Sequence, residues 1–195
     1  MSGPATTNEI RIAGFGGQGV ILAGMILGKG ATIFENRHAT LVQSFGPEAR
    51  GGSCSAQVVL SDQPIAYPYV ARPKVLVAMS QEAFEKFVPD VVQGGTLIYE
   101  QDLVKLKDVR GDLKTFGIPA TRIAEELRRK MVLNIVMVGF VTAVTGMVGV
   151  DAVRKAVRDS VPPGTEHLNV AAFDKGYEYG KKLVASGGAA GEGKP

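Results

Sequence analysis

The first residues that could do chemistry form a glycine-rich segment near the start of the chain, Gly14-Phe15-Gly16-Gly17-Gln18-Gly19. It has the spacing G-x-G-x-x-G and lies between an expected strand and an expected helix, where glycines allow a tight turn and a close approach of the backbone. Backbone N–H groups at the start of such a helix attract a phosphate or a carboxylate. The segment therefore predicts a loop that binds an anion or a partner, formed by Gly14, Gly16, Gly17, Gln18 and Gly19.

Three interpretations of this first loop stay open. A nicotinamide-nucleotide domain would also place an acidic residue at the end of the second strand, where it binds the ribose. Here Glu35 precedes that strand, and Gln43 and Ser44 occupy its end. The sequence therefore lacks the second feature that would support an NAD(P) site. The loop binds NAD(P), binds another anionic cofactor, or serves only packing and subunit contact.

A second turn-rich segment, residues 44–54, reads SFGPEARGGSC. Gly51 and Gly52 can adopt backbone conformations with positive φ. Arg50 would project beside free backbone N–H groups, an arrangement suited to a carboxylate or a phosphate. Alternatively, Arg50 pairs with Glu48 in the loop or pairs across a subunit interface. The candidate binding residues of this segment are Arg50, Gly51 and Gly52.

Residues suited to metal binding or to catalysis are few. A single cysteine, Cys54, excludes an intrachain disulfide and a four-cysteine iron–sulfur site within the chain. His38 and His167 are far apart in sequence and have no cysteine at ligand spacing, so no metal site is expected. Cys54 has no visible base to activate it, and we interpret it as a small core residue. No catalytic residue is assigned.

The strands and helices that position these loops are predicted from short apolar runs, which alternate along the chain with segments of helical periodicity. Strands are expected at residues 9–15, 38–43, 55–60, 74–79, 96–99 and 112–116. Helices are expected at residues 19–34, 81–87, 121–145 with a break, 151–158 and 165–184, with Thr121 as an N-cap. This alternation predicts an α/β fold, a single-domain, mostly parallel, doubly wound (Rossmann-like) sheet with helices on both faces. The domain is expected at residues 9–185, between a flexible N-terminus (1–8) and a flexible tail (186–195).

Composition excludes several classes of function. The net charge is +3 without a long basic run, so nucleic-acid binding has no support. Residues 131–150 carry no charge and follow Arg-Arg-Lys, as a membrane span would. Polar residues and three glycines interrupt that run, so we expect a helix buried in the fold or at a subunit interface. No signal peptide is visible, and a cytoplasmic location is expected.

Three segments together resemble a known family. GFGGQGVILAG at 14–24, SFGPEARGG at 44–52 and VVLSDQPIAYP at 58–68 are similar to the gamma subunits of 2-oxoacid:ferredoxin oxidoreductases. The resemblance runs from about Glu9 to Tyr179, and the joint occurrence of the two loops is more specific than either loop alone. The form of both loops is most similar to the members that act on 2-oxoglutarate.

The resemblance implies a subunit of a larger enzyme. Such a complex oxidatively decarboxylates a 2-oxoacid with coenzyme A, giving an acyl-CoA (succinyl-CoA from 2-oxoglutarate), CO2 and reduced ferredoxin. Its alpha and beta subunits would carry thiamine diphosphate with Mg2+, and iron–sulfur clusters would lie in partner subunits. The gamma subunit would support assembly and help to form the coenzyme A region, with Arg50, Gly51 and Gly52 the best candidates for contact.

The residues agree with that division of labour. Gly111-Asp112-Leu113 lacks the second glycine of a G-D-G motif for thiamine diphosphate, and one thiol cannot hold a cluster. The chain alone is expected to bind none of these cofactors and to be inactive. Two alternatives remain, a stand-alone NAD(P)-binding oxidoreductase and a purely structural assembly subunit. The sequence leaves the 2-oxoacid, the electron acceptor and the strand order open.

Overall fold

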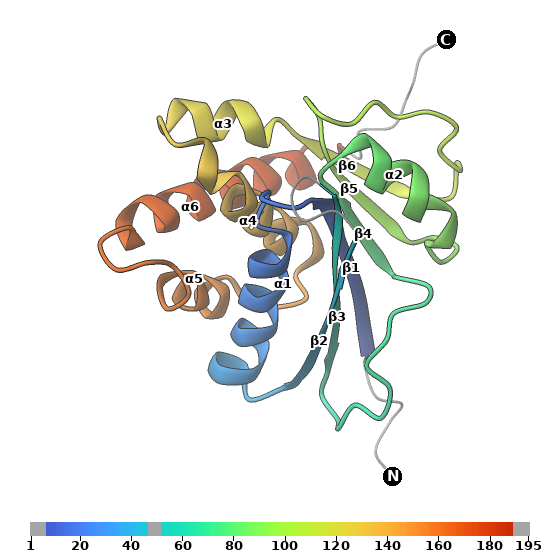
Figure 1. Ribbon diagram of the computed structural model, residues 1–195, viewed down its shortest axis with the longest axis horizontal. Helices are drawn as coiled ribbons and strands as arrows, with labels where there is room; N and C mark the ends of the chain where they lie inside the picture. The colour runs from blue at the N-terminus through green and yellow to red at the C-terminus, as the bar shows by residue number, and fades with distance from the viewer. Residues whose placement is uncertain (1–6, 47–51, 189–195) are drawn as a thin grey trace.

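One mixed sheet of six strands forms the centre of the fold (Figure 1). The computed structural model describes residues 7–46 and 52–188. The strand order is β2-β3-β1-β4-β5-β6, with β1 (Thr7–Phe15), β2 (His38–Phe45), β3 (Ser53–Ser61), β4 (Val75–Ala78), β5 (Thr96–Glu100) and β6 (Lys114–Ile118). Strand β3 is antiparallel to both of its neighbours, β1 and β2, while β1, β4, β5 and β6 are parallel. Five strands therefore share one direction and β3 opposes them, so the predicted α/β class is confirmed.

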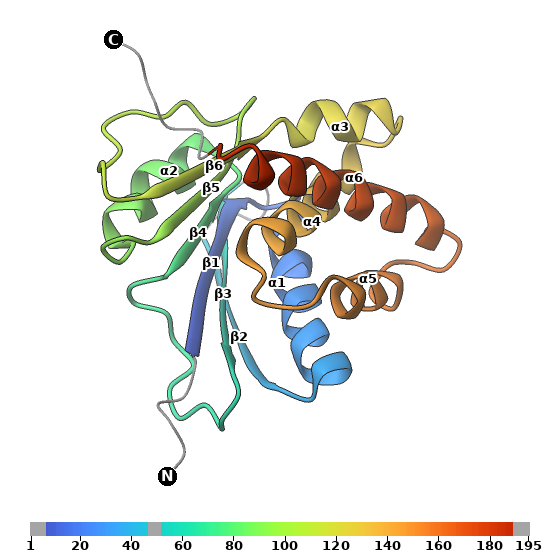
Figure 2. The same cartoon turned by 180° about the vertical axis from the view of Figure 1, so that it is seen from behind.

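Helices cover both faces of this sheet, but unequally (Figure 1, Figure 2). The single helix α2 lies on one face, and the larger group of helices lies on the other. The α-helices are α1 (Val20–Lys29), α2 (Gln81–Phe87), α3 (Ala120–Glu126), α4 (Leu133–Thr145), α5 (Val150–Arg158) and α6 (Glu166–Ala185). A π-helical turn (Gly30–Phe34) extends α1, and 3-10 turns follow α2 (Val88–Asp90) and precede α4 (Lys130–Val132).

The period-2 pattern of the strands explains the two cores. In β4, Val75 and Val77 point into the cluster formed with α1 and α4, while Leu76 and Ala78 point into the cluster formed with α2. All four residues of β4 are buried, because helices cover both sides of this strand. The same alternation in β1 turns Ile10 and Ile12 toward the larger core.

The uncharged run that could have been a membrane span is α4, and it is buried inside this chain. Every residue from Asn134 to Thr142 is buried, and α4 packs closely along α6. A Cβ on Gly139 would lie 2.1 Å from the carbonyl oxygen of Phe173, so the glycine permits this contact. None of the helices in the described parts of the chain is long and apolar enough to cross a bilayer. The expectation of burial within the fold is confirmed.

The start of α3 differs from the prediction that Thr121 is its N-cap. The helix begins at Ala120, and the N–H of Thr121 donates to the carboxylate of Glu100 at 2.9 Å. The other oxygen of Glu100 accepts from the N–H of Leu103 at 2.7 Å, and the side chain is fully buried. The cap comes from the end of β5, far away in the sequence, and satisfies two backbone donors at once.

Candidate functional site

The predicted glycine loop lies at the carboxyl end of β1 and leads into α1. Gly17 and Gly19 have φ values of +98° and +73°, a conformation that favours glycine. A Cβ on Gly19 would lie 2.4 Å from Nδ2 of Asn134, so this glycine lets the loop contact α4. Asn134 in turn donates from Nδ2 to the Gly19 carbonyl at 3.3 Å. The close approach expected of Gly19 is present, with α4 rather than the neighbouring strand as the neighbour.

Gln18 folds back into the loop that contains it. Its Oε1 accepts from the N–H of Phe15 at 2.6 Å, and its Nε2 donates to the carbonyl of Met79 at 2.8 Å. Met79 follows β4 directly, so this one side chain ties together the carboxyl ends of two adjacent parallel strands. Gln18 thus shapes the loop, with one amide hydrogen left over for an external acceptor.

The second predicted segment connects β2 to β3, and the structure brings it to the glycine loop. The N–H of Gly16 donates to the carbonyl of Gly52 at 2.9 Å, which continues the β1–β3 pairing past the end of β1. On the other side, the N–H of Gly46 donates to the carbonyl of Ser53 at 2.7 Å. Arg50 and Gly51 lie outside the described residues, between these two anchored positions. Two motifs about thirty residues apart in sequence are therefore in direct contact, through Gly16 and Gly52.

A small pocket opens where the two segments meet. It has about 20 Å³ of open interior, enough for a water molecule or for a small polar group of a larger ligand. The residues that line it include Gly14 and, from α2, Glu82 and Lys86. Three serines from β2 and β3 also line it, and they are Ser44, Ser53 and Ser55. Ser55 is only 5% exposed, and none of the three hydroxyl groups has a hydrogen-bond partner among the described residues. These hydroxyls are available to a ligand or a partner.

Cys54 borders the same pocket but is not a reactive thiol. It is 6% exposed and belongs to the larger core, as predicted. Burial raises the pKa of its thiol, so the protonated form is favoured and the nucleophilic thiolate is disfavoured. The described residues at this end of the sheet therefore offer hydroxyl and backbone groups for hydrogen bonding, and the thiol is not among the groups favoured for reaction.

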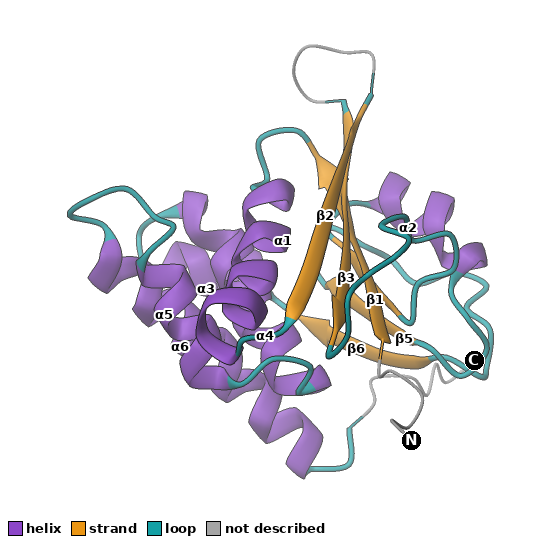
Figure 3. Ribbon diagram, turned by 90° about the horizontal axis from the view of Figure 1, so that it is seen from below, coloured by secondary structure: helices purple, strands orange, loops and turns teal. Residues whose placement is uncertain are grey.

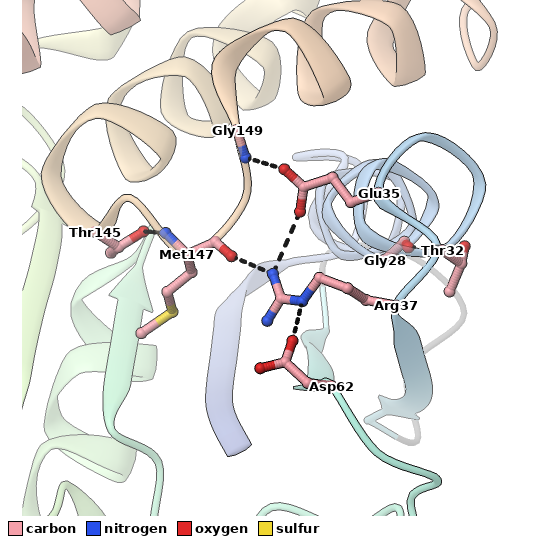
Figure 4. Close-up of polar contacts among 8 residues, drawn as sticks. All are labelled: Gly28, Thr32, Glu35, Arg37, Asp62, Thr145, Met147 and Gly149. Carbon is pink, nitrogen blue, oxygen red and sulfur yellow. Dashed lines mark hydrogen bonds and ion pairs between the residues drawn. The ribbon is translucent and has the colours of Figure 1, made fainter. Parts of the chain in front are cut away.

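The acidic residue that a nicotinamide site would need is engaged elsewhere. Glu35 accepts from the N–H of Gly149 at 2.6 Å and pairs with Arg37 at 3.3 Å (Figure 4). These residues precede β2, whose start pairs with the end of β3 and hence lies beside the start of β1, at the opposite end of the sheet from the glycine loop. In addition, β3 separates β2 from β1, whereas in a dinucleotide-binding fold these two strands are neighbours. The geometry argues against the NAD(P) alternative.

The structure offers no metal site in the parts of the chain that it describes. No group of three His, Cys, Asp or Glu side chains gathers at ligand distance within residues 7–46 and 52–188. His38 lies at the start of β2 and His167 in α6, and both are exposed.

Sequence reasoning missed the serines, α2 and Asn134 as parts of this site. Ser53 and Ser55 are two residues apart on β3, so their shared face was readable from the period of a strand. Asn134 is a polar residue in an apolar run, a signal readable from the sequence, but its partner, Gly19, is distant in sequence. No local signal places α2 beside the loops.

Comparisons with known proteins agree along nearly the whole chain. Residues 9–179 match the family model described as pyruvate ferredoxin/flavodoxin oxidoreductase. The chain is 49% identical to the 2-oxoglutarate synthase subunit KorC of Methanocaldococcus jannaschii, over 90% of this chain and 95% of that protein.

Solved structures give the same result for the fold. The gamma subunit of a keto/oxoacid ferredoxin oxidoreductase from Geobacter sulfurreducens is 38% identical, with a TM-score of 0.78 over 89% of this chain and 98% of that one. The 2-oxoglutarate:ferredoxin oxidoreductase of Magnetococcus marinus, solved with 2-oxoglutarate, coenzyme A and succinyl-CoA bound, is 22% identical with a TM-score of 0.82. That match covers 91% of this chain but 31% of the longer chain, so the same fold also occurs as one part of a larger polypeptide.

Proposed function

Because the chain belongs to the pyruvate ferredoxin/flavodoxin oxidoreductase family, we propose that it is the gamma subunit of a 2-oxoglutarate:ferredoxin oxidoreductase. The complex would oxidatively decarboxylate 2-oxoglutarate with coenzyme A, giving succinyl-CoA and CO2 while electrons pass to ferredoxin. The observation that carries the proposal is the 49% identity to a 2-oxoglutarate synthase subunit over almost the full length of both chains.

Partner subunits would supply the redox chemistry. Thiamine diphosphate with Mg2+ would sit in the alpha and beta subunits, and the iron–sulfur clusters in partner subunits. The single, buried cysteine of this chain supports that division, since a cluster needs several thiolates. We place the complex in the cytoplasm, where the thiol stays reduced.

The joined loops would contribute to the coenzyme A site. The bond between Gly16 and Gly52 joins the loop before α1 to a residue that follows Arg50 by two positions in the sequence, which supports this proposal. Backbone N–H groups at a helix start and a guanidinium are both suited to phosphate, and the nearby serine hydroxyls are suited to the amides of the pantetheine arm. Gly14, Gly16, Gly17, Gln18 and Gly19 would form one wall of this site and Arg50, Gly51 and Gly52 the other.

Reconstitution tests the subunit assignment. The chain is co-expressed with the alpha and beta subunits from its own genome, and the assembly is weighed by native mass spectrometry and assayed for thiamine diphosphate and iron. We expect one complex that contains this chain and both cofactors, and that turns over 2-oxoglutarate faster than pyruvate. A chain that stays alone beside an assembled, active partner complex would contradict the proposal.

The substitution Arg50→Ala separates the coenzyme A role from a purely structural one. We expect normal assembly and an unchanged KM for 2-oxoglutarate. The KM for coenzyme A should rise about tenfold or more, because the substitution removes one charged hydrogen bond. Arg72→Ala is the matched control, because Arg72 is exposed and has no polar partner within the described residues. Loss of assembly in Arg50→Ala alone would favour the assembly subunit instead.

A further inference from the structure

Within residues 7–46 and 52–188, the edge strand β2 lacks the usual protection of a sheet edge. Its eight residues, HATLVQSF, include no Asp, Glu, Lys, Arg or Pro, and β2 is the last strand of the sheet on its side (Figure 3). Edge strands in soluble proteins are normally protected by charge, proline, a bulge or a covering element, because their free N–H and C=O groups pair readily with another strand. An uncharged edge of this length is suited to strand addition.

The register shows which backbone groups of β2 are free. The N–H of Gly46 bonds to Ser53, and bonded pairs alternate along an antiparallel ladder. The residues that exchange bonds with β3 are therefore the even-numbered ones, His38, Thr40, Val42 and Ser44. The odd-numbered residues point their N–H and C=O groups away from the sheet, and they are Ala39, Leu41, Gln43 and Phe45.

An apolar groove runs beside this free edge. It has a volume of about 400 Å³ and lies between α1, the π-helical turn and β2, with Met25, Ile33 and Leu41 among its lining residues. Met25 is 42% exposed and Ile33 is 66% exposed, although both are large apolar side chains. The one charged residue in its lining, Lys29, is paired with Asp159 of α5 at 3.7 Å. The groove therefore presents apolar surface without an unpaired charge.

We propose that an extended, uncharged segment of a partner subunit pairs with the free edge of β2 and inserts an apolar side chain into this groove. The inference rests on the proposed function, since it requires a complex. The odd-numbered residues of β2 would supply the backbone bonds, and Met25 and Ile33 the apolar contact. The occupant carries no charge at the contact, because the groove offers no free ion partner for it.

The position of β2 favours a partner subunit over a second copy of this chain. The same strand runs from the groove to Ser44, which lines the pocket beside the glycine loop, so a strand added to β2 would bring the partner to the proposed coenzyme A site. The fold also occurs as 31% of a longer chain, in which further polypeptide is covalently attached to it. A surface for other subunits is thus expected on this domain.

Hydrogen exchange of β2 amides tests the pairing directly. In the isolated chain, we expect fast exchange at Ala39, Leu41 and Gln43, whose N–H groups are free, and slow exchange at Thr40 and Val42. In the reconstituted complex, we expect exchange at the three odd-numbered positions to slow about tenfold or more, as for other amides in a formed ladder. Unchanged exchange at these positions in an assembled complex overturns the inference and leaves the subunit assignment intact.

Two surface substitutions give an independent readout. Gln43→Pro removes one outward N–H and Ile33→Glu places a charge in the groove, while the bonds from β2 to β3 are kept. We expect both variants to fold, with the midpoint of thermal unfolding close to that of the wild type, and to bind the partner subunits at least about tenfold more weakly. Met131→Glu is the matched control, because Met131 is 91% exposed and lies outside the groove.

The other possible results of these two experiments also test whether a partner segment pairs with β2. Variants that assemble as tightly as the wild type overturn the inference. A homodimer of the isolated chain that protects the same odd-numbered amides, and that Ile33→Glu dissociates, also overturns it, since the occupant is then a second copy. If wild-type chain and partner subunits never assemble, the proposed function fails first and the edge inference fails with it.

Discussion

Just before β2, charged side chains pair with one another inside the chain, whereas where β1 ends several serine hydroxyl groups have no partner among the described residues. At the first end, Arg37 donates to Glu35, to Asp62 and to the carbonyl of Met147 (Figure 4). At the second end, the hydroxyls of Ser44, Ser53 and Ser55 line the pocket beside the glycine loop. A site that is satisfied internally stabilises the fold, and a site with spare donors is available for binding. The difference supports the proposed binding role of the carboxyl end of β1.

The largest effect on stability is expected at the first end. Arg37→Ala would remove the donor to Asp62, to one of the two Glu35 oxygens and to the carbonyl of Met147, and we expect a loss of about 3 kcal/mol in the free energy of unfolding. Urea denaturation measures the loss. In the assembled enzyme the variant should keep the wild-type KM for coenzyme A, since Arg37 is far from the loops.

Arg158→Ala is the control for this variant, because Arg158 is exposed and without a polar partner within the described residues. It should change the free energy of unfolding by less than about 0.5 kcal/mol. A raised KM for coenzyme A in Arg37→Ala would contradict the assignment of the two ends.

A smaller loss of stability is expected at Gln18, which belongs to the second end but is satisfied internally. Gln18→Ala removes the bonds to Phe15 and Met79, and we expect a loss of roughly 2 kcal/mol in the free energy of unfolding. Because the side chain also shapes the loop, the KM for coenzyme A should rise as well. Gln63→Ala is a suitable control, since Gln63 is exposed and its side chain makes no hydrogen bond within the described residues. Equal effects of both substitutions would show that Gln18 does not hold the loop.

Burial of Cys54 predicts a pH dependence of stability. Its pKa is raised in the folded state, so the folded chain keeps a proton that the unfolded chain releases as the pH rises. The contribution is fully present below the ordinary thiol pKa of about 8.5 and is lost as the pH rises above it. Between pH 8 and pH 9.5, the unfolding free energy of the wild type should fall more steeply than that of Cys54→Ala. Parallel slopes for the two proteins would contradict a buried, protonated thiol.

Much of the fold was predictable because its strands and helices carry local signals. All six strands were found from short apolar runs, and the break between α3 and α4 was expected. The strand order was not predictable, since the placement of β3 between β2 and β1 depends on pairs such as His38 with Ser61 and Phe15 with Ser53. The cap of α3 by Glu100 depends on a contact across twenty-one residues, which no local pattern contains.

In the candidate site, too, the features with local signals were predictable and those that depend on distant contacts were not. The conformations of Gly17 and Gly19 follow from a local turn, and the spacing of glycines predicted the loop. The bond from Gly16 to Gly52 and the pocket that includes Lys86 depend on how the sheet is assembled, so the residues alone gave no sign of them. From the sequence, only the resemblance to a family indicated that the two loops belong together.

The smallest effect on stability is expected at Ser55, and it is the sharpest test of the second end. Ser55 lines the pocket and its hydroxyl has no hydrogen-bond partner within the described residues, so Ser55→Ala should change the free energy of unfolding by less than about 0.5 kcal/mol. In the assembled enzyme, the KM for coenzyme A should nevertheless rise several-fold, because a ligand group loses a hydrogen bond. Ser186→Ala serves as the control for the KM, since Ser186 is exposed after α6, does not line the pocket, and its hydroxyl donates locally to the carbonyl of Leu183 at 2.8 Å. A loss of stability of about 2 kcal/mol with an unchanged KM would mean that Ser55 serves the fold, and the contrast between the two ends would fail at this residue.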